Sequence, residues 1–196
     1  MSHTLAEAIT RRRALLITPF AFAGLVAVSS HKGSDSAEEA TPDSGGEITI
    51  ITFNNSGQRL GPARVRKVAR SREEWRKLLS TEQFYVTREE GTDTAFTGTY
   101  YQLHESGLFR CICCDNALFR SEEKFDSETG WPSFWAPAAE ENIRTRSDTS
   151  MFIERTEVLC RRCDAHLGHV FNDGPEPTGL RYCINESALR FVRVAA

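Results

Sequence analysis

Four cysteines form two Cys-x-x-Cys pairs, Cys111/Cys114 and Cys160/Cys163, with 45 residues between the pairs. A tight Cys-x-x-Cys turn directs two thiolates at one point, and two such turns complete a tetrahedral zinc site. One pair alone would be a weak signal, but the two together predict one structural Zn²⁺ per chain, held by all four thiolates.

Three other readings of the cysteines have to be weighed. Either pair could be a thioredoxin-like redox site, but neither lies in a strand–helix–strand pattern. All six cysteines could form disulfides in an oxidising compartment, which the adjacent Cys113 and Cys114 make awkward. A compact Cys₂His₂ site within residues 160–169 would leave the first pair without a role.

A fifth cysteine, Cys183, stands alone in an apolar segment. Most such cysteines are inert core residues. On a strand, however, Arg181 and Asn185 would share the face of Cys183, because side chains alternate with a period of two. A cation beside a thiol favours the thiolate, which is the nucleophilic form. His166 and His169 flank a Leu-Gly pair and are candidates for acid–base work, or else hydrogen-bonded loop residues.

The segment Gly130-Trp131-Pro132-Ser133-Phe134-Trp135 places three aromatic rings around a proline. It could be a plug in the core. Beside a reactive thiol, it could instead form an apolar wall that holds a methyl–sulfur group.

The elements that must position these residues are mainly strands. Residues 47–53 predict a strand that ends at Asn54-Asn55-Ser56-Gly57. Ser71 and Glu74 form a capping box, which predicts a helix, and a second short helix is expected from Thr81 with Phe84 and Tyr85. Short apolar pieces then recur between turn residues, at 107–109, 151–153, 158–159 and 179–184. The texture predicts a β-rich domain without strand–helix–strand units.

The first residues read as an export signal. Arg11, Arg12 and Arg13 precede an apolar stretch at 14–28 that is shorter than a membrane span. We expect a twin-arginine-like signal peptide at 1–29, and hence a periplasmic or secreted protein that meets the membrane only through this leader. A basic amphipathic helix is the alternative. Residues 30–47 are rich in Ser, Asp, Glu, Gly and Pro and predict a flexible linker.

Charge and composition exclude other classes of protein. The net charge is −3 for the whole chain. Without residues 1–29 it becomes 21 − 26 = −5, which argues against a nucleic-acid surface. The 40% of hydrophobic and 26% of charged residues argue against wholesale disorder.

Taken in order, these motifs resemble the methionine-R-sulfoxide reductases. The resemblance rests on the two Cys-x-x-Cys pairs, Phe125-Asp126-Ser127, Gly130–Phe134, His166–Phe171, Asp173-Gly174-Pro175 and Arg181–Asn185, with 82–88 similar to an entrance helix. It implies a mainly β fold of β-tent type, with two small antiparallel sheets, short N-terminal helices and a Cys₄ zinc site away from the active site. The reductase domain would span 65–194, after an N-terminal strand extension at 48–64.

The resemblance also implies roles for single residues. The catalytic set would be the nucleophile Cys183, the proton-assisting His169, a second polar contact at His166, and Asn185, which would orient that network. Substrate contacts would be Trp131, which receives the methyl group, with Phe134 and Arg181. The products would be methionine and a sulfenic acid on the nucleophile. We therefore expect repair of oxidised proteins, or reduction of free methionine sulfoxide, with a thioredoxin-like or other thiol as reductant.

Two positions depart from the family pattern. Many relatives carry a resolving cysteine where this chain has Thr129, and a small residue where it has Glu186. Cys113 is the remaining cysteine but lies inside a metal knuckle, so we expect direct reduction by an external thiol, with a mobile Cys113 as the alternative. The rival function is a zinc-stabilised β module that binds a partner without turnover. Such a module would not need Cys183, His169 and Asn185 together.

Overall fold

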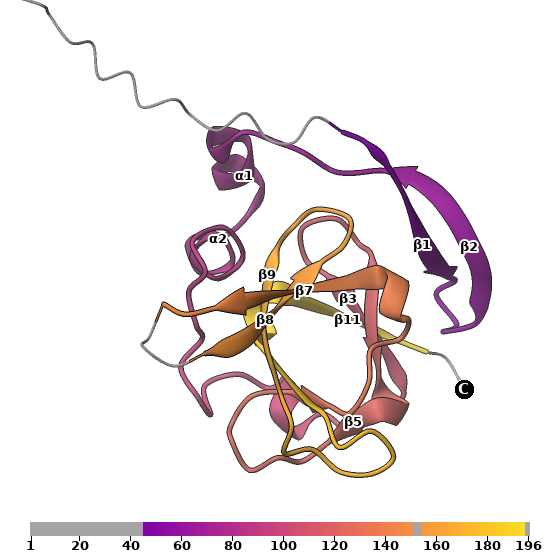
Figure 1. Cartoon of the computed structure of the whole chain (residues 1–196), viewed down its shortest axis with the longest axis vertical. Coiled ribbons are helices and arrows are strands. Elements are labelled where there is room, and N and C mark those ends of the chain that lie inside the picture. Colours follow the sequence, from indigo (N-terminus) through magenta and orange to yellow (C-terminus); the bar gives the residue numbers. More distant parts are fainter. Residues whose placement is uncertain (1–44, 151–153, 195–196) are drawn as a thin grey trace, which may run out of the picture. The chain divides into compact units, whose positions relative to one another are not determined.

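The computed structural model describes residues 45–150 and 154–194, all within one compact unit at 40–196. The predicted signal peptide, nearly all of the predicted linker and the apolar piece at 151–153 lie outside the described residues. The strands of this unit form three antiparallel sheets (Figure 1).

The largest sheet has six strands in the order β5-β6-β10-β9-β8-β7. Their bounds are β5 Lys124–Phe125, β6 Ser133–Phe134, β7 Ile143–Asp148, β8 Arg155–Cys160, β9 His166–Phe171 and β10 Arg181–Ile184. The second sheet has the order β11-β3-β4, with β3 Gly107–Cys111, β4 Ala117–Arg120 and β11 Leu189–Arg193. Among the described residues, three short 3₁₀ helices lie between these strands, and a fourth precedes β3. The three are η2 Ser121–Glu123, η3 Glu140–Asn142 and η4 Glu186–Ala188, and the fourth is η1 Tyr100–Gln102. The predicted pair of antiparallel sheets is confirmed.

A third sheet, the hairpin of β1 (Glu47–Phe53) and β2 (Arg59–Arg66), was only partly foreseen. The predicted strand at 47–53 is confirmed as β1. The strand β2 continues to Arg66, beyond residue 64, where the N-terminal strand extension was predicted to end. Asn142 ties the hairpin to the domain: its side chain accepts from the Ile51 amide at 2.7 Å and donates to the Ile51 and Ala117 carbonyls at 2.8 Å. One buried amide thereby satisfies three backbone groups of two sheets.

Two short helices precede β3, as predicted: α1 (Arg72–Leu78) and α2 (Thr81–Arg88). Ser71 and Ser80 each cap one helix with a capping box, which satisfies amides that the first turn leaves free. Trp75 and Phe84 are buried and anchor the helices to the core, whereas Tyr85 is 50% exposed. In the described part of the chain, no helix has the length and apolar character to cross a membrane.

The main core lies between the two larger sheets and is rich in aromatic rings. Phe134 is 0% exposed and stacks on Phe119 with 4.5 Å between ring centroids. Its edge also meets Phe109 at 5.0 Å. The expectation that Phe134 contacts substrate is therefore corrected, because its ring is enclosed by other core rings.

Candidate active site and metal centre

The two Cys-x-x-Cys turns have the same backbone geometry. In each, the fifth residue has a left-handed conformation, with φ of 63° at Asp115 and 54° at Asp164. The amide of that residue donates to the carbonyl of the first cysteine, Cys111 or Cys160, at 2.9 Å. β3 and β8 each end in the first cysteine of a pair, so the sheets bring the two turns together.

The four sulfur atoms of Cys111, Cys114, Cys160 and Cys163 lie within 4.8 Å of one another. Two of the Sγ–Sγ distances, Cys111–Cys163 and Cys114–Cys160, are 3.6 and 3.5 Å. Four sulfurs at about 2.3 Å from a tetrahedral zinc would be about 3.8 Å apart, whereas a disulfide needs about 2.05 Å. All six cysteines are free, and the arrangement fits a metal ion.

Two polar side chains support this cluster. Arg88 donates to the Cys163 carbonyl at 2.7 Å and to its Sγ at 3.4 Å, and the Asn116 amide reaches the Cys160 Sγ at 3.7 Å. A guanidinium beside thiolates offsets part of the negative charge that four deprotonated ligands would bring. The predicted four-cysteine metal site is confirmed as an arrangement of ligands.

Cys183 lies on β10, between β6 and β9. Its register partners are Ser133 on β6 and His169 on β9. Opposed residues of an antiparallel pair have Cβ atoms about 4.5–5.5 Å apart, so the thiol and the imidazole are close neighbours. β9 approaches β10 this closely at Gly168, where φ is 150° and a Cβ atom would lie 2.1 Å from the Cys183 carbonyl oxygen. The glycine between the two histidines is thus required by the strand pairing.

Burial raises the pKa of the Cys183 thiol, and Arg181, Thr129 and Ser133 oppose that rise. At neutral pH the group therefore carries its proton until substrate or base arrives. Arg181 and Cys183 share one face of β10, as predicted, and the guanidinium is held by two bonds to Asp173 at 2.9 and 2.8 Å.

Arg181 does not line the cavity beside Cys183, and its contact with substrate stays a prediction. The Arg181 guanidinium carbon also lies over the Phe171 ring, 4.5 Å from the ring centroid. This contact helps to hold the positive charge beside the Cys183 thiol. Its position favours the thiolate form of Cys183.

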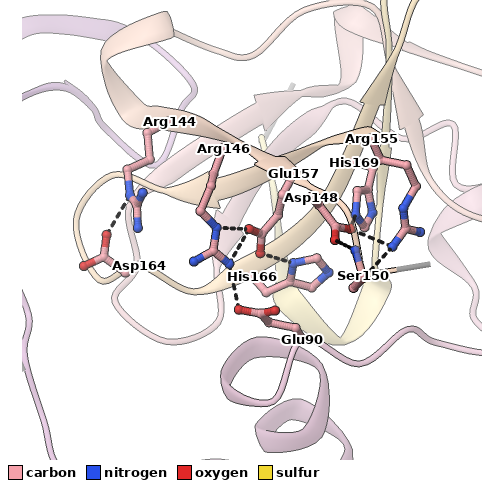
Figure 2. Close-up of polar contacts among 10 residues, drawn as sticks. All are labelled: Glu90, Arg144, Arg146, Asp148, Ser150, Arg155, Glu157, Asp164, His166 and His169. Atoms are coloured by element: carbon pink, nitrogen blue, oxygen red, sulfur yellow. Dashed lines mark hydrogen bonds and ion pairs between the residues drawn. The ribbon is translucent and has the colours of Figure 1, made fainter. Parts of the chain in front are cut away.

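A carboxylate orients His169 (Figure 2). Its Nε2 is 2.8 Å from Asp148 Oδ2, and Arg155 donates to the same oxygen at 2.6 Å. Because an ionised carboxylate only accepts, Nε2 carries the hydrogen and Nδ1 is the nitrogen free to take a proton. Bonds from Ser150 and then from His169 hold the pKa of Asp148 well below its usual range.

The pKa of His169 is lowered, chiefly by burial. The hydrogen bond to Asp148 opposes this, while Arg155 and His166 add to it. The imidazole is therefore neutral near pH 7 and able to act as a base.

His166 lies behind His169 rather than at the cavity. It is 3% exposed and its Nδ1 is 2.7 Å from Glu157 Oε1, while Arg146 donates to Glu157 Oε2 at 2.7 Å (Figure 2). The two imidazole rings meet edge to face with 5.4 Å between centroids. His166 thus supports the His169 ring and does not line the cavity beside Cys183.

Asn185 has a different role from the expected one. It follows the end of β10 and is buried. Its Oδ1 accepts from the Asp93 amide at 2.9 Å and its Nδ2 donates to the Leu167 carbonyl at 3.2 Å. The Asp93 carbonyl in turn accepts from Trp131 Nε1 at 2.9 Å. Asn185 therefore positions the indole of Trp131 through Asp93. In the described part of the chain, no hydrogen bond joins Asn185 to His166 or His169.

A cavity of about 140 Å³ opens beside the thiol. Its walls combine the Trp131 and Phe171 rings with the polar groups of His169 and Arg155. The full lining is Thr92, Trp131, Arg155, Gly168, His169, Phe171, Cys183, Ile184 and Asn185. Sequence reasoning missed Asp148, Arg155 and Asp93, since none belongs to a recognisable motif.

The two departures from the family pattern have structural consequences. Thr129 contributes a hydrogen bond at the Cys183 thiol, and its hydroxyl is 2.8 Å from that of Ser127. Glu186 accepts from the Thr99 and Tyr100 amides at 2.7 Å and so fixes the start of η1. Cys113 donates to Thr87 on α2 at 3.4 Å, beside the metal ligands.

Comparison with known proteins agrees with this geometry. The SelR domain matches residues 79–193. A peptide methionine sulfoxide reductase of Hahella chejuensis is 56% identical over 125 residues, 64% of this chain and 90% of its own. A mitochondrial methionine-R-sulfoxide reductase of Rattus norvegicus is 50% identical over 132 residues, 64% of this chain and 76% of its own. The chain therefore belongs to the SelR family of methionine-R-sulfoxide reductases.

Proposed function

We propose that this protein reduces methionine-R-sulfoxide to methionine, with Cys183 as the nucleophile. The observation that carries the proposal is the pairing of the Cys183 thiol with a carboxylate-oriented, neutral His169 across two strands, at a cavity walled by aromatic rings. A thiol, a base and an apolar wall are the groups that a sulfoxide reduction needs.

The first half-reaction balances with these groups alone. His169 Nδ1 takes the proton of the Cys183 thiol, the thiolate attacks the sulfoxide sulfur, and the proton passes to the sulfoxide oxygen. Oxygen transfer then yields methionine and a sulfenic acid on Cys183. The thiol sulfur is oxidised, the substrate sulfur is reduced, and the thiol proton ends on the transferred oxygen.

The cavity suits the end of the substrate side chain. A cavity of about 140 Å³ has room for several small groups, and the end of the substrate side chain consists of a methylene, a sulfur, an oxygen and a methyl. The rings of Trp131 and Phe171 favour the methyl group, and sulfur–aromatic contacts favour the sulfur. His169 and Arg155 stand on the polar side, where the oxygen would lie.

The metal of the four-cysteine cluster is zinc in our proposal. Four thiolates in tetrahedral array are the ligand set of structural zinc, which leaves no position open for substrate. Cys111, Cys114, Cys160 and Cys163 would hold it, and it would join the end of β3 to the end of β8 without taking part in the reaction.

Regeneration requires an external thiol. Thr129 occupies the position beside the nucleophile and cannot form a disulfide, while Cys113 makes its contacts beside the metal ligands. A first thiol would condense with the sulfenic acid and release water, and a second would restore the Cys183 thiol and leave as a disulfide. A thioredoxin-like or glutathione-type donor fits this role.

The variant Thr129→Cys tests this point. After one turnover without reductant it should contain an intramolecular disulfide to Cys183, whereas the wild-type protein should retain a sulfenic acid that a dimedone-type reagent traps. A Cys113–Cys183 disulfide in the wild-type protein would show that the mobile-cysteine alternative is right.

We also propose a location and a layout for the chain. The three consecutive arginines before an apolar stretch support export by a twin-arginine route, with 30–47 as the tether to the folded domain. Replacing Arg11 and Arg12 by lysine should trap the precursor inside cells. If cell fractionation shows that this variant is exported as efficiently as the wild-type protein, the twin-arginine route is contradicted.

A turnover assay with the two separated epimers tests the function. We expect the R epimer to be consumed, the S epimer to remain, and Cys183→Ser to be folded, metal-loaded and inactive. Cys113→Ser is the matched control, since it removes a thiol that the reaction does not use. A folded wild-type protein without turnover would favour the binding module over the enzyme.

A further inference from the structure

A second cavity, of about 180 Å³, adjoins the catalytic one. The two share the Trp131 ring in their walls. Neighbouring residues of the chain also line the two cavities. Thr92 and Asn185 line the catalytic cavity, whereas the next residues, Asp93 and Glu186, line the second one. The two cavities therefore adjoin each other on either side of Trp131.

Three carboxylates line this second cavity, those of Glu82, Asp93 and Glu186, and no cation lines it. Among residues 45–150 and 154–194, none of the three forms an ion pair, whereas Asp148, Glu157 and Asp173 each meet an arginine. We call this cavity the acidic pocket.

The acidic pocket contains one polar group that the fold leaves unsatisfied. Asp93 is 9% exposed, and its Oδ2 accepts from the Ser187 amide at 2.8 Å. Its Oδ1 has no hydrogen-bond partner within the described part of the chain. A buried carboxylate oxygen without a donor is costly, so the site favours a ligand that brings both a positive charge and hydrogen-bond donors.

The spacing of the carboxylates decides which cation fits. The described residues contain one group of metal-binding side chains with atoms close enough for a single ion, and it is the cysteine cluster. The three carboxylates are thus too dispersed to hold one metal ion together. A long side chain with several donors, such as a lysine ammonium or an arginine guanidinium, can serve dispersed acceptors.

We propose that the acidic pocket binds the side chain of a lysine or arginine that flanks the oxidised methionine in a peptide or protein substrate. This inference rests on the proposed function and names a substrate class for it. With the sulfoxide against one part of the Trp131 ring, an extended chain advances about 3.3 Å per residue and brings a neighbouring side chain to the acidic pocket.

The test uses three short peptides with blocked ends, in which methionine-R-sulfoxide is flanked on both sides by Lys, by Gln or by Glu. We expect kcat/KM to fall in that order, with a Lys-to-Glu ratio of about five- to ten-fold at low ionic strength that shrinks as salt screens the charges. Most of the difference should appear in KM, because the contact is remote from the reacting sulfur.

The variant Glu82→Gln should lower the Lys-to-Glu ratio by about two- to three-fold. Glu73→Gln is its matched control: Glu73 and Glu82 are both the second residue of a short helix with a capping box, and only Glu82 lines the acidic pocket. The control should keep the wild-type ratio. Glu186→Gln is a second variant, expected to act in the same direction as Glu82→Gln.

Each outcome separates the pocket from the function. Equal kcat/KM for the three peptides, with all reduced, would overturn the acidic pocket and leave the reductase intact. If no peptide is reduced, the proposed function fails first. A third outcome is that Glu82→Gln changes kcat/KM for free methionine-R-sulfoxide relative to kcat/KM for its N-acetyl form and leaves kcat/KM for the peptides unchanged. The pocket would then bind the ammonium group of the free amino acid, and the proposal would be wrong.

Discussion

Replacing Asn185 by alanine removes the two hydrogen bonds that join the end of β10 to Asp93 and Leu167. The Asp93 amide is then left without a partner in a buried place, whereas the Leu167 carbonyl keeps its bond from the backbone amide of residue 185 at 2.8 Å. One unsatisfied buried group costs about 1–3 kcal/mol, so we expect the free energy of unfolding to fall by about that amount. At about 2–4 °C per kcal/mol, the melting temperature should fall by roughly 2–12 °C.

The kinetic effect of Asn185→Ala follows from the path through Asp93 to Trp131. Once the Asp93 backbone is released, the carbonyl that holds Trp131 Nε1 shifts and the indole loses its fixed position. We expect KM for the R epimer to rise about five- to ten-fold, with a smaller change in kcat. Steady-state kinetics and calorimetry on the metal-loaded protein measure both effects.

Two further variants make the Asn185 prediction sharper. Asn54→Ala, in an exposed turn, is the control and should leave KM unchanged. Combining Asn185→Ala with Trp131→Phe, which removes the indole N–H, should give a non-additive effect because the residues act in one chain of contacts. If Asn185→Ala lowers kcat and shifts the pH profile with KM unchanged, then Asn185 acts on the histidines and the reasoning is refuted.

Three further predictions concern the metal, the thiol and the base. Wild-type protein should contain one zinc per chain by elemental analysis. Cys160→Ala should lose the zinc, and its melting temperature should fall by more than about 10 °C, or it should fail to express in soluble form. Active protein free of zinc would contradict this. Arg181→Ala should shift the pH dependence of Cys183 alkylation to higher pH, because Arg181 lowers the pKa of that thiol, and Arg181→Lys should shift it less. The extent of alkylation at each pH is measured by mass spectrometry of the labelled peptide. In the wild-type protein, kcat/KM should fall in acid as His169 gains a proton, at a pH below the ordinary pKa of histidine because burial lowers the His169 pKa. Asp148→Asn should move that fall to still lower pH, since the Asp148 bond raises the His169 pKa, and a move to higher pH would refute the base role.

Local chemistry made much of this molecule predictable. The capping box of Ser71 and Glu74 predicted the first helix, and the metal cluster follows from two turns whose geometry is set within five residues. Cys183 and His169 belong to apolar segments that had to be strands, so their pairing needed only the correct neighbour in the sheet.

The errors arose where three-dimensional contacts decide. The period of two does not say which face of β6 is the core, and Phe134 turned out to face other rings. Asn185 lies one residue beyond β10, so the alternation that relates Arg181 to Cys183 no longer applies to it. Asp148 reaches His169 only because β7, β8 and β9 are adjacent, and no local pattern connects two residues so far apart in sequence.

The most direct test of the central claim is a single turnover without reductant. Metal-loaded protein is mixed with excess methionine-R-sulfoxide, and both methionine and protein mass are followed over time. We predict one methionine per chain, together with one added oxygen that peptide mapping assigns to Cys183, and neither product with the S epimer or with Cys183→Ser. Methionine formed in full by Cys183→Ser, or the oxygen found on another cysteine, would contradict the account.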